Sequence, residues 1–262
     1  MKLLSLIIAF FQGAFLVLWL VFWITIAGLS AILTLNGEVP LMMARRFWGP
    51  MHWRITGSPL QVEPLPDIDW SKPHIFLMNH QSALDIPVAF AVLPVNIRFI
   101  AKHVLKYVPF LGWYMVMTGM IFINRANRHE ALRSLQLAGE RIRAGSNLLA
   151  FPEGTRSRDG RILPFKKGSF VLALEAQVPI VPMAIEGTLA MLPTGSAHLR
   201  YSPIRVKVGA PISTAGRTAA DRDALVREVR AAIIRLHQDI GGVGGEPDPV
   251  TPGQGLDVTS PA

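Results

Sequence analysis

A histidine and an aspartate five residues apart carry the clearest chemical signal in the chain. His80 and Asp85 lie in the sequence Asn-His-Gln-Ser-Ala-Leu-Asp at residues 79–85, directly after an apolar run at 75–78. The run predicts a buried strand, and Ser82 predicts the cap of a following helix. Because His80 would then lie in the loop and Asp85 at the start of the helix, the carboxylate can turn back onto the imidazole. A histidine held in one tautomer by a carboxylate is the arrangement of a general base.

Taken alone, this spacing also fits an ordinary structural histidine, and a second polar cluster is what favours catalysis. Residues 151–157 read Phe-Pro-Glu-Gly-Thr-Arg-Ser and follow another strand-like apolar run. The cluster offers a carboxylate, a hydroxyl and a guanidinium, and the guanidinium fork of Arg156 matches phosphate oxygens. Gly154 would let the backbone approach a substrate closely.

The composition limits the class of partner. The chain has 262 residues, half of them hydrophobic, and a formal net charge of +8. This charge favours anionic partners, namely phospholipid surfaces, phosphorylated substrates or an acidic carrier protein. The basic residues are scattered and form no recognisable nucleic-acid module, so no nucleic-acid partner is expected. The absence of cysteine excludes disulfides, thiolate metal sites and a cysteine nucleophile.

Three segments of different composition predict the domain organisation. Residues 1–57 are expected to be membrane-anchoring and interfacial helices, residues 58–240 a catalytic domain, and the Gly- and Pro-rich residues 241–262 a disordered tail. Residues 3–37 carry no formal charge. This uncharged stretch is longer than the apolar core of a cleaved signal peptide. A single span, a re-entrant hairpin that turns near Gly28 and a buried helix all remain open for this stretch.

Aromatic and basic residues are mixed between positions 40 and 56, as is typical of a helix at the level of the lipid headgroups. An ordinary amphipathic helix on the protein core would look similar. Arg45, Arg46 and Arg54 fall on this stretch, and the positive-inside rule therefore favours the cytoplasm for the side that carries them.

Strands and helices alternate through the rest of the chain. Strands are expected at 75–78, 97–101, 120–123, 147–151, 180–185 and 204–208, and helices at 104–117 (interrupted at Pro109), 129–143, 170–176 and 219–240. This alternation predicts an α/β fold with a mixed, mostly parallel sheet flanked by helices, preceded by the N-terminal hydrophobic anchoring segment. His80, Arg125 and residues 153–156 each follow a strand. Active groups of such folds gather beyond the carboxyl ends of the strands.

Four ordered blocks of the chain resemble the glycerolipid acyltransferases of the 1-acyl-sn-glycerol-3-phosphate (lysophosphatidic acid) acyltransferase type. The blocks lie at residues 79–85, 119–125, 151–157 and 178–182, and the resemblance covers roughly residues 70–215. It implies that His80 is the general base and that Asp85 orients it. It also implies substrate-binding positions at Asn79, Lys102, Arg125, Glu153, Gly154, Thr155 and Arg156.

Individual roles within the site follow from the residue types. Arg125 and Arg156 are the expected phosphate clamps, although Arg125 could also be a surface charge at the end of a strand. Glu153 could bind glycerol hydroxyls or hold Arg156 in place. Lys102 and the Lys166–Lys167 pair could meet the phosphates of coenzyme A or an acidic carrier protein. No metal and no bound cofactor are expected, and acyl-CoA or acyl carrier protein would be a co-substrate.

The expected function is the transfer of an acyl chain from a thioester to the sn-2 hydroxyl of lysophosphatidic acid, which gives phosphatidic acid for phospholipid synthesis. The enzyme would work at the inner or plasma membrane, in contact with membrane lipids, with its site facing the cytoplasm. Lyso-ornithine lipid or another lysolipid is an alternative acceptor. A membrane-anchored lipid-binding protein without catalysis and a metal-assisted hydrolase are the alternatives from other classes.

Overall fold

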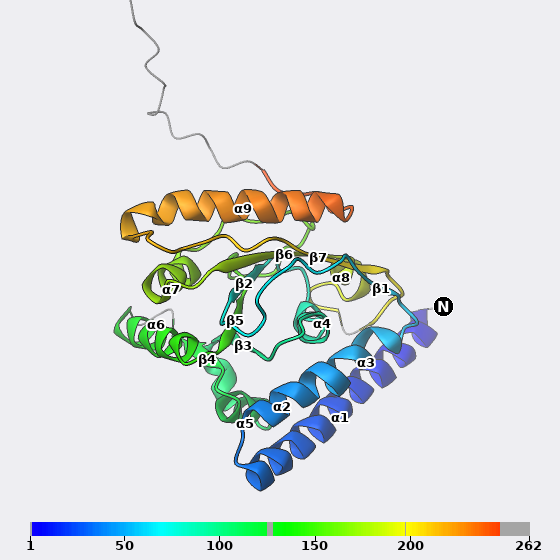
Figure 1. The fold of residues 1–262 in the computed structure, drawn as a ribbon. Helices are drawn as coiled ribbons and strands as arrows, with labels where there is room; N and C mark the ends of the chain where they lie inside the picture. Colours follow the sequence, from blue (N-terminus) through cyan, green and yellow to red (C-terminus); the bar gives the residue numbers. More distant parts are fainter. Residues whose placement is uncertain (1, 125–127, 197, 247–262) are drawn as a thin grey trace, which may run out of the picture.

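A seven-stranded sheet forms the centre of the molecule (Figure 1). The computed structural model describes residues 2–124, 128–196 and 198–246. Within these residues the strands lie in the order β1 (Leu60–Val62), β7 (Ile204–Val208), β6 (Ile180–Glu186), β2 (Ile75–Met78), β5 (Asn147–Ala150), β3 (Ile97–Lys102) and β4 (Ile121–Ile123). Only β6 and β7 pair antiparallel in this sheet. The predicted mixed, mostly parallel α/β fold is confirmed.

The central strand β2 is buried on both faces, which explains its uninterrupted apolar sequence. Ile75 and Leu77 belong to one hydrophobic core and Phe76 and Met78 to the other, because successive side chains of a strand point to opposite faces. The helices α6 (Arg128–Arg143), α7 (Gly168–Ala176) and α9 (Arg222–Asp239) cover one face, and α4 (Asp85–Val92) lies on the other (Figure 1).

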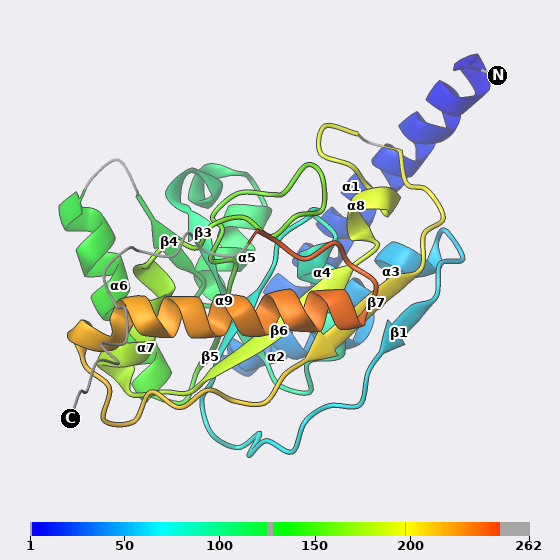
Figure 2. The same cartoon turned by 90° about the horizontal axis from the view of Figure 1, so that it is seen from above.

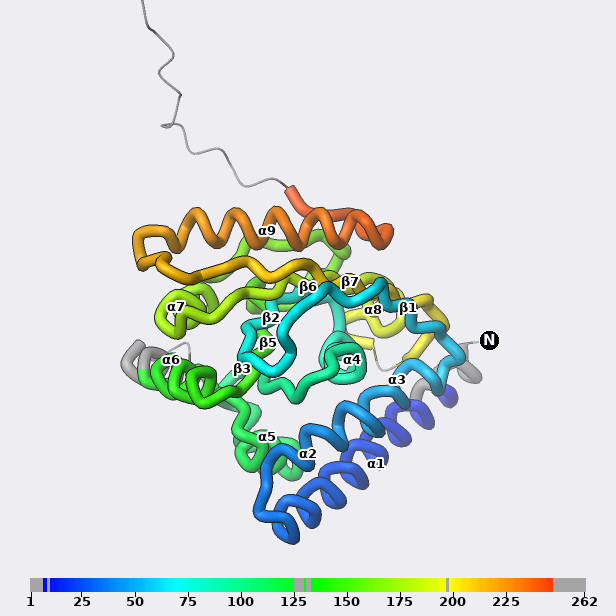
Figure 3. Tube along the Cα trace, viewed as in Figure 1, coloured from blue at the N-terminus to red at the C-terminus, as the bar shows by residue number. Residues whose placement is uncertain are grey.

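The N-terminal segment is a helical hairpin. Helix α1 (Lys2–Thr34) continues through Gly28, and the chain turns only at residues 35–37, so the alternative of a turn near Gly28 is wrong. Helix α2 (Glu38–Met43), the π-helical turn η1 (Ala44–Trp48) and α3 (Gly49–Arg54) then run back beside α1 (Figure 3). Among the described residues, Phe10–Thr34 is long and apolar enough to cross a membrane, and little of it is buried in the protein.

Polar contacts tie the hairpin to the sheet domain. Glu38 pairs with Arg98 of β3, and Arg45 donates to the carbonyl oxygen of Pro94. The hairpin therefore packs as a fixed wall beside the sheet and is not a separate anchor on a linker.

The predicted helix at 104–117, interrupted at Pro109, is present as two short helices. They are the 3-10 helix η2 (His103–Tyr107) and α5 (Leu111–Met117), separated at Pro109. Phe110 has a φ of +62°, which L-residues seldom adopt. The two helices and the link between them carry exposed apolar side chains, and α5 contacts α1; these side chains are Val104, Tyr107, Phe110, Trp113 and Val116.

The start of the predicted disordered tail is packed against the domain. Residues 241–246 turn back along the side of α9 (Figure 2), and the carbonyl oxygen of Gly244 accepts a 2.8 Å hydrogen bond from the N–H of Ile162. This part of the tail corrects the expectation of disorder. Residues 247–262 lie outside the described residues.

Candidate active site

The two polar clusters of the sequence meet at one edge of the sheet. Strands β2 and β5 are parallel neighbours, so that residues 79–85 and 151–157 both begin at the carboxyl ends of adjacent strands. The N–H of Ser157 donates to the carbonyl oxygen of His80 at 2.7 Å, which joins the two loops directly.

His80 and Asp85 form the expected pair. His80 Nδ1 lies 2.7 Å from Asp85 Oδ2. Because an ionised carboxylate only accepts hydrogen bonds, Nδ1 carries the proton, and Nε2 keeps a lone pair that can accept a proton. The His80 side chain is 16% exposed and the Asp85 side chain is fully buried. The ring therefore opens to a substrate while its carboxylate partner is shielded from water.

The buried carboxylate of Asp85 is held by four hydrogen-bond donors. Besides the imidazole, the backbone N–H groups of Gln81 and Ser82 donate to Oδ2 at 2.7 and 2.8 Å. Thr188 Oγ1 donates to Oδ1 at 2.5 Å. Ser82 is not the residue directly before α4, but its Oγ accepts the N–H of Leu84 at 3.3 Å, as expected of a capping side chain. Asp85 satisfies the backbone donors of Gln81 and Ser82, which fixes its orientation toward His80.

Glu153 supports the histidine from the second loop. Its Oε1 accepts the backbone N–H of His80 at 2.7 Å, and its Oε2 accepts the N–H of Leu163 at 2.9 Å. Burial raises the pKa of Glu153 to about 7, and the nearby Asp85 adds to this, while the two N–H donors and Arg230 act in the opposite direction. The side chain is only 2% exposed and does not face the cavity described below.

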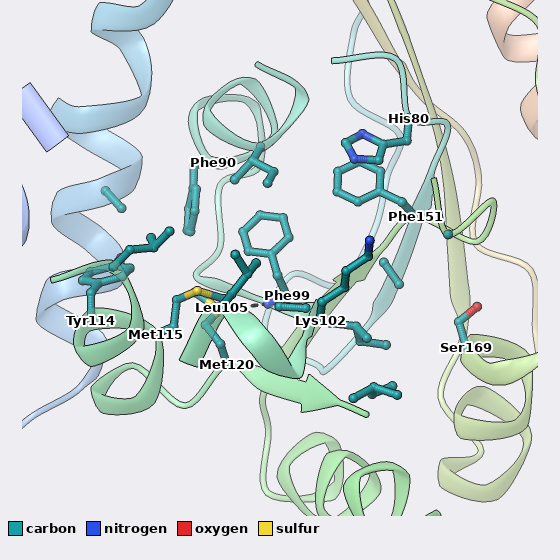
Figure 4. Close-up of a pocket in the computed structure, with 18 of the residues that line it drawn as sticks. His80, Phe90, Phe99, Lys102, Leu105, Tyr114, Met115, Met120, Phe151 and Ser169 are labelled. Carbon is teal, nitrogen blue, oxygen red and sulfur yellow. Dashed lines mark hydrogen bonds between the residues drawn. The ribbon is translucent and has the colours of Figure 1, made fainter. Parts of the chain in front are cut away.

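Phe151 forms the floor under the imidazole. Its ring stacks on that of His80 with a centroid separation of 3.9 Å and an interplanar angle of 17° (Figure 4). The stack and the Asp85 hydrogen bond together fix the plane and the tautomer of the imidazole.

A cavity of about 640 Å³ opens beside His80. One part of its wall comes from the sheet domain, and Figure 4 shows Phe90, Phe99, Met115, Met120 and Tyr114 around it. The hairpin supplies another part through Trp23, Ala27 and Ala44. Lys102, Arg156 and Lys166 are the basic residues of the lining. A mostly apolar cavity with a few polar groups is the usual form of a small-molecule site.

The predicted substrate-binding residues divide into two groups. Lys102, Gly154, Thr155 and Arg156 line the cavity, and Figure 4 shows the Lys102 amine reaching toward the His80–Phe151 stack. Asn79 and Glu153 do not line it. Both polar atoms of the Asn79 amide bond to the backbone of Ile185, at 3.0 and 2.8 Å, so Asn79 joins β2 to β6. Arg125 lies outside the described residues.

Sequence reasoning missed Thr188. Its sequence signal is the polar stretch Glu186-Gly187-Thr188 after the predicted strand at 180–185. That strand, β6, lies next to β2 and parallel to it. Gly187 has a φ of +93°, and a Cβ there would lie 2.0 Å from the carbonyl oxygen of Pro203. The tight turn that glycine allows brings Thr188 back onto Asp85.

No group of three or more His, Cys, Asp or Glu side chains positioned to hold a metal ion is found in the described part of the chain. The site consists of a histidine–carboxylate pair beside a cavity with a mostly apolar lining that is basic along one part.

The chain is similar to known acyltransferases. The family model for acyltransferases matches residues 59–186. A 1-acyl-sn-glycerol-3-phosphate acyltransferase of Saccharomyces cerevisiae is 35% identical over 72% of this chain and 63% of its own length. The human 1-acyl-sn-glycerol-3-phosphate acyltransferase beta is 36% identical over 67% of this chain and 66% of its own length. The chain thus spans somewhat less than two thirds of these curated relatives.

The crystal structure of a 1-acyl-sn-glycerophosphate (LPA) acyltransferase from Thermotoga maritima superposes with a TM-score of 0.78. The match covers 91% of this chain and 96% of the other at 26% identity. Residues 59–186 therefore carry the acyltransferase domain, and the chain is similar in sequence and fold to the 1-acyl-sn-glycerol-3-phosphate acyltransferases.

Proposed function

We propose that the protein transfers an acyl chain from an acyl thioester to the sn-2 hydroxyl of lysophosphatidic acid, giving phosphatidic acid. The observation that carries this proposal is the position of His80. Its Nδ1 is bound to Asp85 at 2.7 Å while the ring lines a largely apolar cavity. The names of the relatives supply the substrate class.

In the proposed reaction, His80 Nε2 takes the proton of the glycerol hydroxyl as the oxygen attacks the thioester carbonyl carbon. The new C–O bond forms, the C–S bond breaks, and the imidazolium returns its proton to the departing thiolate. Asp85 stabilises the imidazolium during this step. General-base assistance of this kind contributes about 10²–10⁴-fold to the rate. The alcohol of the acceptor is itself the nucleophile, so no acyl-enzyme is required.

The phosphate of the acceptor is assigned to the basic part of the cavity. Arg156 and Lys102 line it together with His80, and a guanidinium can bind two phosphate oxygens at once. Arg125 remains a proposed second clamp. The apolar part of the cavity, between the sheet domain and the hairpin, is assigned to an acyl chain. Lys166 and its neighbour Lys167 are candidates for the phosphates of coenzyme A or an acidic carrier protein.

The membrane is the proposed surface on which the enzyme works. Helix α1 exposes Phe10, Phe11 and Leu18, and the adjacent η2 and α5 expose Tyr107 and Trp113. These exposed apolar side chains are suited to contact with lipid. We place the site on the cytoplasmic side because three arginines follow α1 on the returning helices.

A matrix of donors and acceptors tests the proposal. Acyl-CoA and acyl carrier protein would each be offered with lysophosphatidic acid, lyso-ornithine lipid and other lysolipids, on membranes that contain the wild-type protein or His80→Ala. Transfer to lysophosphatidic acid that is lost in His80→Ala is expected. Transfer to lyso-ornithine lipid alone would replace the acceptor, and lipid binding without any transfer would favour a binding protein.

A further inference from the structure

A second histidine–carboxylate pair, with a buried imidazole and a partly exposed carboxylate, lies close to the His80–Asp85 pair. His237 of α9 is fully buried, and its Nε2 is 2.6 Å from Oε2 of Glu186, the last residue of β6. The proposed reaction uses neither residue, and neither lines the cavity beside His80. Because burying an ionisable group is costly, a buried histidine paired with a carboxylate next to the His80 loop indicates a specific role.

The end of the described chain sets the tautomer of His237. The backbone N–H of Gly244 donates to His237 Nδ1 at 3.2 Å. Nδ1 is therefore the acceptor, and Nε2 carries the proton that it donates to Glu186. The fit is close, since a Cβ at Gly242 would lie 2.2 Å from the imidazole and Gly244 has a φ of +72°. The glycines of this segment allow the backbone to reach the ring.

Gln81 connects this pair to the catalytic carboxylate. Its side-chain Nε2 donates to Glu186 Oε2 at 3.0 Å, and its backbone N–H donates to Asp85 Oδ2 at 2.7 Å. Gln81 follows His80 directly in the chain. A movement of Glu186 or His237 would therefore shift a donor that orients Asp85.

Gly244 is also connected to Glu153, the residue that accepts the backbone N–H of His80. Its carbonyl oxygen accepts the N–H of Ile162 at 2.8 Å. The next residue, Leu163, donates its N–H to Glu153, which accepts the N–H of His80. The contacts thus close into a ring through His80, Asp85, Gln81, Glu186, His237, Gly244, Ile162, Leu163 and Glu153.

We propose that His237 is a positioning residue and that residues 241–246 are a strap that holds the catalytic loop in its reactive geometry. The strap closes the ring through Gly244, which supports Asp85 on one side and the His80 backbone on the other. This inference rests on the proposed acyl transfer. It concerns kcat, because His80 is the member of the ring that lines the cavity and the other members do not line it.

Two truncations of the full chain test the strap. A protein that ends at residue 246 keeps Gly244, and one that ends at residue 240 loses it. We expect the first to match the wild type and the second to lose about 10–100-fold in kcat, the cost of small misplacements in a reacting pair, with KM for both substrates changed less than about twofold. Equal kcat values for the two truncated proteins would overturn the role of the strap.

Two substitutions of His237 separate its two hydrogen bonds. Gln in His237→Gln extends an amide N–H toward Glu186, whereas the shorter His237→Asn offers an acceptor only near Gly244. We expect His237→Gln, which keeps the donor to Glu186 but loses the acceptor for Gly244, to lose less kcat than His237→Asn, at similar melting temperatures. Arg235→Ala, an exposed change on the same helix, is the control. Equal losses in both His237 variants that follow their thermal stability would overturn the proposal.

The same assays distinguish the failure of this inference from that of the proposed function. If the wild-type protein transfers no acyl chain to any lysolipid, the proposed function fails. If the wild type is active and both the truncation at 240 and His237→Asn keep its kcat, only the positioning role fails.

Discussion

Thr188 donates a hydrogen bond of 2.5 Å to the oxygen of Asp85 that does not bind His80. The catalytic carboxylate is thus held by β6 as well as by its own loop. Thr188→Val leaves a buried carboxylate oxygen without its donor, at a cost of about 1–3 kcal/mol. We expect kcat to fall by roughly tenfold or more, by analogy with other misplaced reacting groups. Thr188→Ser keeps the hydroxyl and is expected to keep most of the rate; an equal loss in both variants would argue against the hydrogen bond.

Substitution of His80 or Asp85 is expected to have a large effect on kcat. Removing the base in His80→Ala, or the charge that stabilises the imidazolium in Asp85→Asn, should each lower kcat by about 10²–10⁴-fold. The two effects should not add, because the residues act as a unit. Steady-state assays of both single variants and the double variant measure this. Asp67→Asn, an exposed carboxylate away from the site, is the control.

Glu153 predicts a pH dependence of stability. Because burial raises its pKa to about 7, above the ordinary value of 4.5, the folded protein binds this proton more tightly than the unfolded chain. The stabilisation is complete below pH 4.5 and is lost as the pH rises through 7, by about 3 kcal/mol in total.

Glu153→Gln should remove this contribution. Denaturant unfolding in detergent between pH 5 and 8 should show a free energy of unfolding that declines more steeply with pH in the wild type than in the variant. The variant is expected to be less stable overall, since an amide nitrogen cannot accept the N–H that Glu153 now accepts. Parallel curves for the two proteins would contradict the raised pKa.

Ala27 predicts a change in acyl-chain preference. It lies on α1 and lines the apolar part of the cavity, so Ala27→Leu should shorten the chain that fits best. Ala31→Leu is the matched control, because Ala31 is buried on the same helix but does not line the cavity. Competition among thioesters of graded length, read by mass spectrometry, measures the preference. A similar shift in both variants would indicate a general disturbance of the hairpin.

Arg156 predicts a change in acceptor affinity. A charge-assisted hydrogen bond is worth about 1.5–3 kcal/mol, so Arg156→Ala should raise the KM for lysophosphatidic acid by about 10–100-fold with a smaller effect on kcat. Arg156→Lys should recover only part, since an ammonium lacks the planar fork. Arg158→Ala, an exposed neighbour, should behave like the wild type. An acceptor without phosphate should be insensitive to all three changes.

The sequence predicted the features that depend on local patterns. The apolar run at 75–78 and the polar residues after it placed His80 at a strand end, and the structure puts it there. The helical stripe of Leu225, Val229 and Ile233 is buried as expected. Both features follow from the periodicity of strands and helices, which a single sequence shows directly.

Other features depend on contacts between distant segments. Thr188 lies 103 residues from Asp85 in the chain, and no local pattern reveals which strand will lie beside β2. Asn79 and Glu153 follow strands as the pattern required, yet their side chains bind backbone groups. A position at the end of a strand determines where the backbone of a residue lies, but it does not determine where the side chain points. Similarly, Gly28 permits a turn without requiring one, and the uncharged helix continues to residue 34.

The shared wall between the hairpin and the cavity has a consequence for how the protein can be handled. Trp23, Ala27 and Ala44 enclose the same space that His80 faces. Deleting the hydrophobic N-terminal hairpin to obtain a water-soluble enzyme would remove one wall of that cavity and open it to solvent. Such a shortened protein should keep the His80–Asp85 pair and still lose its selectivity among acyl chains of different length.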